Sequence, residues 1–200
     1  MTRARETLGM SRRQDSSRTV GRLRDDVTIR PEQSRDRGAI ADVVAVAFGS
    51  PKEAWLVEAI RSSTNFVPEL SLVAEVLGRV VGYVMVSVVT IQDGATQHRV
   101  ACLSPLAVAP AFQRRGIGSA LVREVVARAD DRCEPLVVLE GSPAFYGRFG
   151  FEHSVPHGIE ITLPPWAPPG AAQILRLRNY DPSIRGCVVY PPAFDTVAEH

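Results

Sequence analysis

Lysine and cysteine are both scarce in this chain of 200 residues. Lys52 is the only lysine, against 22 arginines, a bias that points to no particular function. The three cysteines, Cys102, Cys133 and Cys187, are an odd number without C-x-x-C spacing, which argues against a disulfide framework or a metal site. Each has apolar neighbours, so we expect three small core residues. Unpaired cysteines of this kind are typical of a cytoplasmic protein.

Long apolar runs are absent as well. The longest, Val80–Val89, covers ten residues and is interrupted by Gly82 and Ser87, whereas a membrane helix needs about 20. The basic N-terminus is not followed by the apolar core of a secretory signal. We therefore expect neither a membrane span nor an exported protein.

The residues that are present fit one globular domain with a single core. The net charge is +1, but residues 1–24 carry seven arginines against two acids, a net of +5, which leaves −4 for the remainder. We expect a disordered basic tail over residues 1–25 and a folded domain over residues 26–200. The tail could contact nucleic acid or acidic lipid, but the acidic remainder argues against a nucleic-acid surface on the domain.

The first part of the domain alternates between helical and strand patterns. The predicted elements are, in order, a strand at 27–31, helices at 34–48 and 52–62, and strands at 70–77, 79–90 and 98–109. Ser34 is the expected N-cap of the first helix. Phe48 is expected on its buried face, while Trp55 in the second helix suits either the core or a ligand contact. The three later strands predict an antiparallel meander.

The fourth predicted strand contains Pro105. Proline cannot donate to a strand ladder, so inside a strand it indicates a bulge or an interruption of pairing. An interruption would leave the backbone groups of Leu106, Ala107 and Val108 without strand partners, and a ligand that carries amides could supply them. An edge strand facing solvent is the alternative.

A basic glycine turn follows that strand and leads into an amphipathic helix at about residues 117–131. Gly116 and Gly118 let the backbone approach a ligand closely, and the free N–H groups at a helix start favour phosphate. Arg114 and Arg115 add charged donors. The turn has no P-loop lysine, and position 121 is Leu where a dinucleotide fingerprint needs a third glycine. The pattern therefore predicts a phosphate site of another kind.

The remaining chain predicts one more parallel strand and a C-terminal hairpin. Residues 135–140 form an apolar strand that a helix separates from the fourth one, so the two should be parallel neighbours. Ser142 and Pro143 predict the start of a short helix that Gly150 ends. After a proline-rich segment, residues 172–178 and 186–190 are expected to pair as a closing hairpin.

This order of elements resembles the GCN5-related N-acetyltransferase (GNAT) superfamily over roughly residues 27–190. The residues Gln113-Arg-Arg-Gly-Ile-Gly118 match the Q/R-x-x-G-x-G/A motif of that family, and Ala144-Phe-Tyr-Gly-Arg-Phe-Gly-Phe151 looks like its tyrosine-bearing segment. The C-terminal segment around Tyr190 is similar to that of a bacterial subgroup of predicted acetyltransferases. The resemblance implies an α/β fold: a single domain with a mixed, mostly antiparallel sheet, in which strands four and five are parallel and splayed, flanked by helices.

The resemblance also implies an activity, the transfer of an acetyl group from acetyl-CoA to an amine. The donor would bind to Leu106, Ala107 and Val108 and along the turn, at Gln113, Arg114, Arg115, Gly116, Ile117, Gly118 and Ser119. Tyr146 is the expected acid that protonates the leaving thiolate. Glu140 at the end of the fifth strand is the candidate base by position, although a water chain is an alternative.

Three points stay open at this level. A non-catalytic module that binds acyl-CoA is the rival function, because the fourth strand carries no carboxylate and offers only Cys102 and Ser104, with His98 near its start. No metal is expected. The acceptor amine cannot be identified, and the protein could be a monomer or a homodimer.

Overall fold

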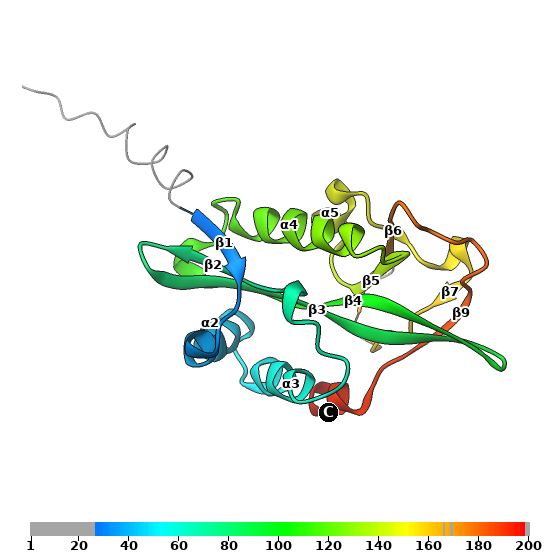
Figure 1. Cartoon of the computed structure of the whole chain (residues 1–200), viewed down its shortest axis with the longest axis horizontal. Helices are drawn as coiled ribbons and strands as arrows, with labels where there is room; N and C mark the ends of the chain where they lie inside the picture. Colours follow the sequence, from blue (N-terminus) through cyan, green and yellow to red (C-terminus); the bar gives the residue numbers. More distant parts are fainter. Residues whose placement is uncertain (1–26, 166, 169, 199–200) are drawn as a thin grey trace, which may run out of the picture.

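A nine-stranded sheet runs through the molecule, with helices on both of its faces (Figure 1). The structure, a computed structural model, describes residues 27–165, 167–168 and 170–198, so the tail predicted over residues 1–25 lies outside the described residues. The strands are β1 (Val27–Pro31), β2 (Ser71–Val76), β3 (Arg79–Asp93), β4 (Thr96–Val108), β5 (Leu136–Glu140), β6 (Glu152–His153), β7 (Ile159–Glu160), β8 (Ala172–Arg176) and β9 (Gly186–Val189). The α-helices are α2 (Arg37–Phe48), α3 (Lys52–Arg61), α4 (Ile117–Asp131), α5 (Pro143–Tyr146) and α6 (Asp195–Ala198). Short 3-10 turns are η1 (Ser34–Asp36), η2 (Pro68–Leu70), η3 (Pro110–Phe112), η4 (Gly147–Phe149), η5 (Val155–His157) and η6 (Pro192–Phe194).

The sheet has the order β1-β2-β3-β4-β5-β8-β6. Strands β1 to β4 are antiparallel neighbours, and β5 lies parallel to β4, which confirms the predicted mixed sheet. Strand β9 pairs with the far half of β3 and with β7. The long strand β3 is buried on both faces along its middle, as expected of a central strand that helices cover on both sides.

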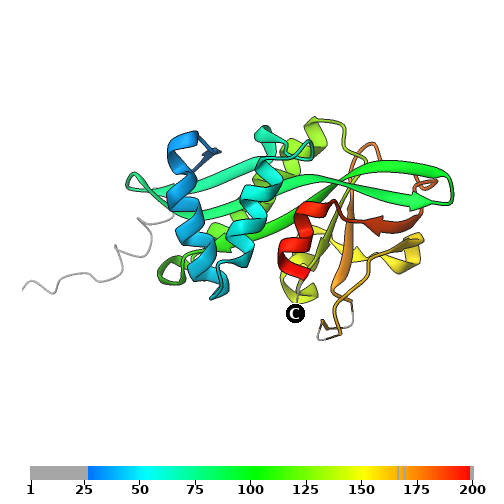
Figure 2. The same cartoon turned by 90° about the horizontal axis from the view of Figure 1, so that it is seen from below.

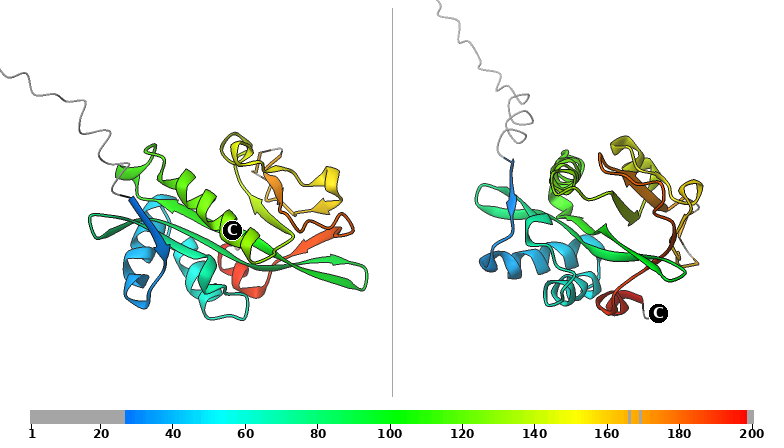
Figure 3. Two further views of the ribbon diagram at one scale, coloured as in Figure 1. Left: turned by 45° about the horizontal axis from the view of Figure 1, so that its top comes forward. Right: turned by 45° about the vertical axis from the view of Figure 1, so that its right-hand side comes forward.

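Two helical layers sandwich this sheet. Helices α4 and α5 lie on one face, and α2, α3 and the C-terminal helix α6 lie on the other (Figures 2 and 3). Helix α4 buries the stripe that its sequence predicts, because these side chains recur every three or four residues. The buried members of the stripe are Ile117, Leu121, Val122, Val125 and Ala129. They pack in an apolar cluster on the α4 face of the sheet.

The bulge predicted at Pro105 is present, but its consequence differs from the expectation. Ser104 and Pro105 together lie opposite Met85, and the ladder with β3 resumes at Leu106, which pairs with Val84. Leu106, Ala107 and Val108 therefore keep partners on β3, because a bulge absorbs the missing proline N–H locally. Only the edge of these residues that faces β5 has no strand partner in the described part of the chain.

The start of the first helix and two aromatic residues also differ from the prediction. Gln33 and Asp36 form a capping box around η1, so α2 begins at Arg37 and Ser34 is not its N-cap. Phe48 is 45% exposed because it ends α2, and Trp55 is 57% exposed because it lies on the outer side of α3. The inner side of α3 is instead occupied by Ala54, Leu56, Val57 and Ile60.

The expected closing hairpin of the last two strands is wrong. Strand β8 pairs with β5 and β6, whereas β9 crosses to β3. The outer edge of β5 is buried and needs a partner, and β8 supplies a five-residue ladder there.

The expectation of three buried cysteines is also corrected. Cys102 is buried, but Cys133 and Cys187 are exposed.

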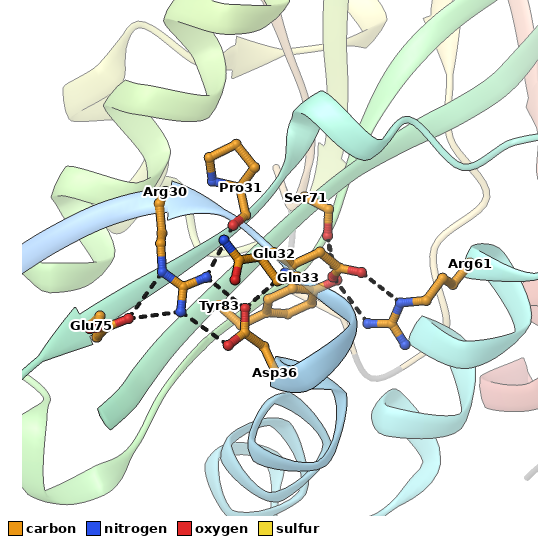
Figure 4. A network of polar contacts seen from close by, with 9 residues as sticks. All are labelled: Arg30, Pro31, Glu32, Gln33, Asp36, Arg61, Ser71, Glu75 and Tyr83. Atoms are coloured by element: carbon orange, nitrogen blue, oxygen red, sulfur yellow. Dashed lines mark hydrogen bonds and ion pairs between the residues drawn. The ribbon is translucent and has the colours of Figure 1, made fainter. Parts of the chain in front are cut away.

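A polar network joins α3 to the sheet and to the β1–α2 connection (Figure 4). Glu32 accepts hydrogen bonds from Arg61 Nε at 2.7 Å, Ser71 Oγ at 2.6 Å and the Tyr83 hydroxyl at 2.9 Å. Beside it, Arg30 contacts Asp36 and Glu75. The network holds the helical layer against β2 and β3 at a fixed position.

Candidate active site

A cavity of about 520 Å³ opens where β4, the glycine turn and the short helix α5 meet. It lies on the α4 face of the sheet, and its lining combines the two sequence motifs. The lining residues are Leu106, Val108, Gln113, Arg114, Gly116, Gly118, Ser119, Phe145 and Arg148.

The turn presents backbone donors to this cavity. Gly116 is the N-cap residue of α4 and has φ of +88°, a conformation that suits glycine. No side chain caps α4 in the part of the chain that the structure describes, so the first N–H groups of the helix remain free for an anion. At Gly118 a Cβ would lie 3.6 Å from Val108 and 3.7 Å from Phe145. A side chain at position 118 would therefore occupy part of the cavity, and glycine leaves that space open.

Seven of the ten predicted donor-binding residues line the cavity, and three do not. The side chain of Ala107 is buried on the α2/α3 face, because neighbouring residues of a strand point to opposite faces. Ile117 is buried beneath α4. The Arg115 guanidinium lies over the ring of Phe112, 5.3 Å from its centroid.

Gln113 has a structural task within the turn. Its Nε2 donates a hydrogen bond of 3.0 Å to the carbonyl oxygen of Val108. The bond joins the turn to Val108, the last residue of β4. Gln113 thereby fixes the position of the turn at the edge of the cavity.

The cavity lies beside the part of β4 that does not pair with β5. These strands pair only at Ala101–Val137 and Cys102–Val138, and beyond that point they diverge. The side of Leu106 and Val108 that faces β5 is thus exposed to the cavity, as the sequence motif implies for an amide-bearing ligand.

Tyr146 stands at the carboxyl end of β5, packed on the α4 face. Its ring meets Phe145 and Phe151 edge-on and lies so close to Gly141 that a Cβ there would be 2.4 Å from the tyrosine ring. Burial raises the pKa of Tyr146 to about 12. The phenol is therefore protonated at neutral pH and can donate a proton.

Glu140 lies at the same strand end but on the opposite face, because alternate β5 side chains point to opposite sides. Its Oε1 accepts a hydrogen bond of 2.6 Å from the hydroxyl of Tyr190. Partial burial raises the pKa of Glu140, and the hydrogen bond from Tyr190 only partly offsets this rise. Cys102 lies nearby, and its pKa is raised by its own burial and by the charge of Glu140.

Sequence reasoning overlooked Arg148 and Phe145, which line the cavity together with the glycine turn. The Arg148 guanidinium lies 4.4 Å from the centroid of the Phe145 ring, and its Nε donates to the Phe145 carbonyl. The signal was present two residues after Tyr146, but an arginine in an aromatic segment has no recognisable pattern of its own.

No metal-binding cluster of three or more His, Cys, Asp or Glu side chains occurs in the described residues. Within the same residues, no helix is long and apolar enough to span a membrane.

The sheet with its splayed parallel pair and its cationic glycine turn defines an acetyltransferase of the GNAT class. The chain belongs to the acetyltransferase (GNAT) family, whose model matches residues 39–151. Among curated proteins it is similar to the uncharacterized N-acetyltransferase YjhQ of Escherichia coli, at 34% identity over 58% of this chain and 65% of YjhQ, slightly under two thirds of that protein. It is also 34% identical to the uncharacterized N-acetyltransferase YhbS of E. coli, over 68% of this chain and 80% of YhbS.

Two solved structures of the family resemble the whole fold. The crystal structure of YhbS from E. coli in complex with CoA aligns with a TM-score of 0.76 and 31% identity, over 85% of this chain and 92% of that one. A GNAT family acetyltransferase from Brucella melitensis in complex with acetyl-CoA aligns with a TM-score of 0.68 and 32% identity, over 84% and 98% of the two chains.

Proposed function

We propose that this chain transfers an acetyl group from acetyl-CoA to a primary amine of a small molecule or a protein, by direct attack within a ternary complex. The observation that carries the proposal is the cavity in which the glycine turn, the start of α4 and the free edge of β4 converge. The YhbS structure holds CoA and the Brucella melitensis structure holds acetyl-CoA. Because acetyl-CoA is a cytoplasmic metabolite, a cytoplasmic location belongs to the proposal.

Each wall of the cavity has a task in binding the donor. The N–H groups from Gly116 to Ser119 and the Arg114 side chain would bind the pyrophosphate. The backbone of Leu106 and Val108 would pair with the amides of the pantetheine arm. Arg148 would add positive charge to the same cavity.

The proposed chemistry uses the Tyr146 hydroxyl and the Glu140 carboxylate, which both lie near the carboxyl end of β5. A neutral amine attacks the thioester carbonyl, the C–S bond breaks, and the leaving thiolate takes a proton from the Tyr146 hydroxyl. The proton that the amine loses passes to Glu140 or to water. The protein positions both substrates, which is the larger part of the task.

Release of free thiol from acetyl-CoA with a panel of primary amines tests the proposal. We expect release with at least one amine, and Tyr146→Phe should lower kcat about 100-fold while the KM for acetyl-CoA changes less than about twofold. Unchanged turnover in the Tyr146→Phe variant would remove the acid role. Tyr180→Phe is the matched control, because the Tyr180 ring meets His157 edge-on instead.

A non-catalytic module that binds acyl-CoA is the second candidate. The lack of a general base on β4 favours it. Where β4 separates from β5, its only titratable side chain is Cys102, and burial raises the pKa of Cys102 so that it stays a neutral thiol. Tight CoA binding without thiol release for any amine would support this candidate and contradict the enzyme.

A further inference from the structure

The segment that follows β9 lies beyond the part of the chain that matches the family model. We call residues 190–197 the C-terminal strap. The strap turns back beneath the sheet, and its η6 and α6 pack against α3 (Figure 2). It therefore covers the face of the sheet opposite to α4 and the donor cavity.

Aromatic packing fixes the strap in place. The rings of Tyr190 and Phe194 lie 4.8 Å apart between centroids, at an interplanar angle of 36°. Phe194 packs against the apolar cluster beneath α2 and α3 and also against the cluster around Cys102 and Val138. Tyr190 is thus held between the helical layer and the sheet, with its hydroxyl directed at the end of β5.

The hydroxyl of Tyr190 occupies one oxygen of Glu140. It donates to Oε1 at 2.6 Å, and Oε2 has no hydrogen-bond partner among the residues that the structure describes. Glu140 is exposed in spite of this contact, so Oε2 is accessible from solvent. The carboxylate is held in one orientation and still has one acceptor oxygen free.

A second polar group lies on the same face of the sheet. Ser87 pairs with Cys102 across the β3–β4 ladder, and its Oγ is fully buried without a hydrogen-bond partner in the described residues. Buried hydroxyls are usually bonded, so Ser87 is a point at which a buried water could bind beneath this face. Cys102 in turn lies close enough to Glu140 for the carboxylate charge to raise the pKa of its thiol.

We propose that the strap forms one wall of the acceptor site and that Tyr190 is a positioning residue, which orients Glu140 so that Oε2 binds the ammonium group of the incoming amine. The inference rests on the proposed function and deepens it: the acceptor binds as a cation on the face opposite to the donor, and it loses one proton to water before the neutral amine attacks. Tyr190 does not contact the reacting atoms. It acts through Glu140.

The first test needs no turnover. The pKa of Glu140 is measured by carbon-13 NMR of the labelled carboxyl group, assigned with Glu140→Gln. The titratable groups that face Glu140 are Tyr190 from the strap and Cys102 from β4, and both stay neutral in the acidic range because burial raises the pKa of each. We expect the pKa of Glu140 to rise by about one unit in Tyr190→Phe, because the variant loses a hydrogen bond to the charged form. Tyr180→Phe should leave the pKa unchanged.

The second test uses n-butylammonium as a probe of the acceptor side. Its addition should shift the Glu140 carboxyl resonance in the wild type and shift it several-fold less in Tyr190→Phe. With the most active amine of the panel, Tyr190→Phe should lower kcat/KM for the amine about tenfold and leave the KM for acetyl-CoA unchanged.

The outcomes separate this inference from the proposed function. Equal Glu140 pKa values in the wild type and Tyr190→Phe, or no response of Glu140 to n-butylammonium, would overturn the role of Tyr190 and the strap. Failure of the protein to bind acetyl-CoA would overturn the proposed function instead. A loss of acetyl-CoA affinity in Tyr190→Phe would place the strap on the donor side, against the inference.

Discussion

At the scale of single residues, the turn before α4 depends on two unusual backbone conformations. Gly116 has φ of +88° and Arg114 has φ of +59°. Glycine adopts the left-handed region at no steric cost, whereas arginine does so only when its surroundings impose it. The glycine could be recognised in the sequence. The conformation of Arg114 could not, because it results from closing the turn onto β4.

Replacement of Gly116 by alanine tests the need for this conformation. The added methyl group would meet no atom within 4 Å, so only the backbone conformation opposes it. We expect Gly116→Ala to lose about 1–2 kcal/mol of unfolding free energy and to raise the KM for acetyl-CoA, as measured by urea unfolding and steady-state kinetics. Gly38→Ala is the control, because Gly38 lies in α2 with equal space and without a positive φ. Equal losses in both variants would contradict the explanation.

Arg148 and Arg123 allow a matched comparison at the donor cavity. Both guanidinium groups lie 5.4 Å from the centroid of the Phe149 ring, but only Arg148 lines the cavity. We expect Arg148→Ala to weaken CoA binding about tenfold, the loss of one charge-assisted contact, and Arg123→Ala to leave it within about twofold. Isothermal titration with CoA measures both. The same weakening in the two variants would indicate loss of packing on Phe149 instead of loss of a phosphate contact.

At the scale of elements, the network around Glu32 joins α3 to the sheet (Figure 4). The side chains of Arg61 and Glu32 are 4% and 9% exposed, so this ion pair is withdrawn from water. Burial alone would raise the pKa of Glu32, but hydrogen bonds from Arg61, Ser71 and Tyr83 outweigh burial, and the pKa is lowered. The network therefore favours the ionised carboxylate in the folded state.

Acid should weaken this attachment of α3. Since the folded-state pKa of Glu32 lies below its unfolded value of 4.5, its contribution to stability is complete above that pH and is lost as the pH falls through the folded-state pKa. We expect Glu32→Gln to lower the unfolding free energy at pH 7 by about 3 kcal/mol and to flatten its decline in acid. Urea unfolding from pH 7 to pH 3 measures both effects.

Glu58→Gln serves as the control for that variant. Glu58 also pairs with Arg61, but its side chain is 48% exposed. We expect a loss below about 1 kcal/mol, because water screens an exposed ion pair. Similar losses for the two variants would show that burial does not determine the strength of this network.

At the scale of the whole molecule, the sheet separates two working faces. The cavity that we propose to bind the donor lies on the face that α4 covers, and the strap with Glu140 lies on the face of α2 and α3. The sheet is open between the two faces where β4 and β5 stop pairing. Glu140 is the last residue of β5, and the ring of Tyr146 lies next to Gly141, which follows it.

The described domain should fold without the N-terminal tail. Residues 1–25 are rich in arginine and serine and contain few large apolar residues, whereas residues 27–197 supply the three apolar clusters. We expect the truncated chain to keep its melting temperature within about 2–4 °C and to keep its CoA affinity. A marked loss of either would assign a structural role to the tail. DNA binding that disappears on truncation and falls steeply with salt would assign it a nucleic-acid role.

Local patterns predicted the elements that local physics determines. The stripe of α4, the apolar β3, the bulge at Pro105 and the parallel β4–β5 pair could all be predicted, because periodicity and proline chemistry act within a few residues. The partners of β8 and β9 could not, because a strand sequence carries little information about which distant edge it will cover. Trp55 was ambiguous for the same reason: an aromatic side chain in a short helix fits either face until the packing is known.

The sequence by itself determined the elements that we propose to bind the donor: a glycine turn, a helix start and a tyrosine segment, each of which can be recognised from residues close together in the chain. Only the tertiary structure decided the proposed acceptor side, where Tyr190 meets Glu140 across 50 positions of the chain. On the other face, it alone brings Arg148 to the cavity that the glycine turn also lines. Contacts of this kind depend on which strands pair in the sheet and on which strand edges stay unpaired. They arise from burial of the whole domain, and local pattern does not encode them.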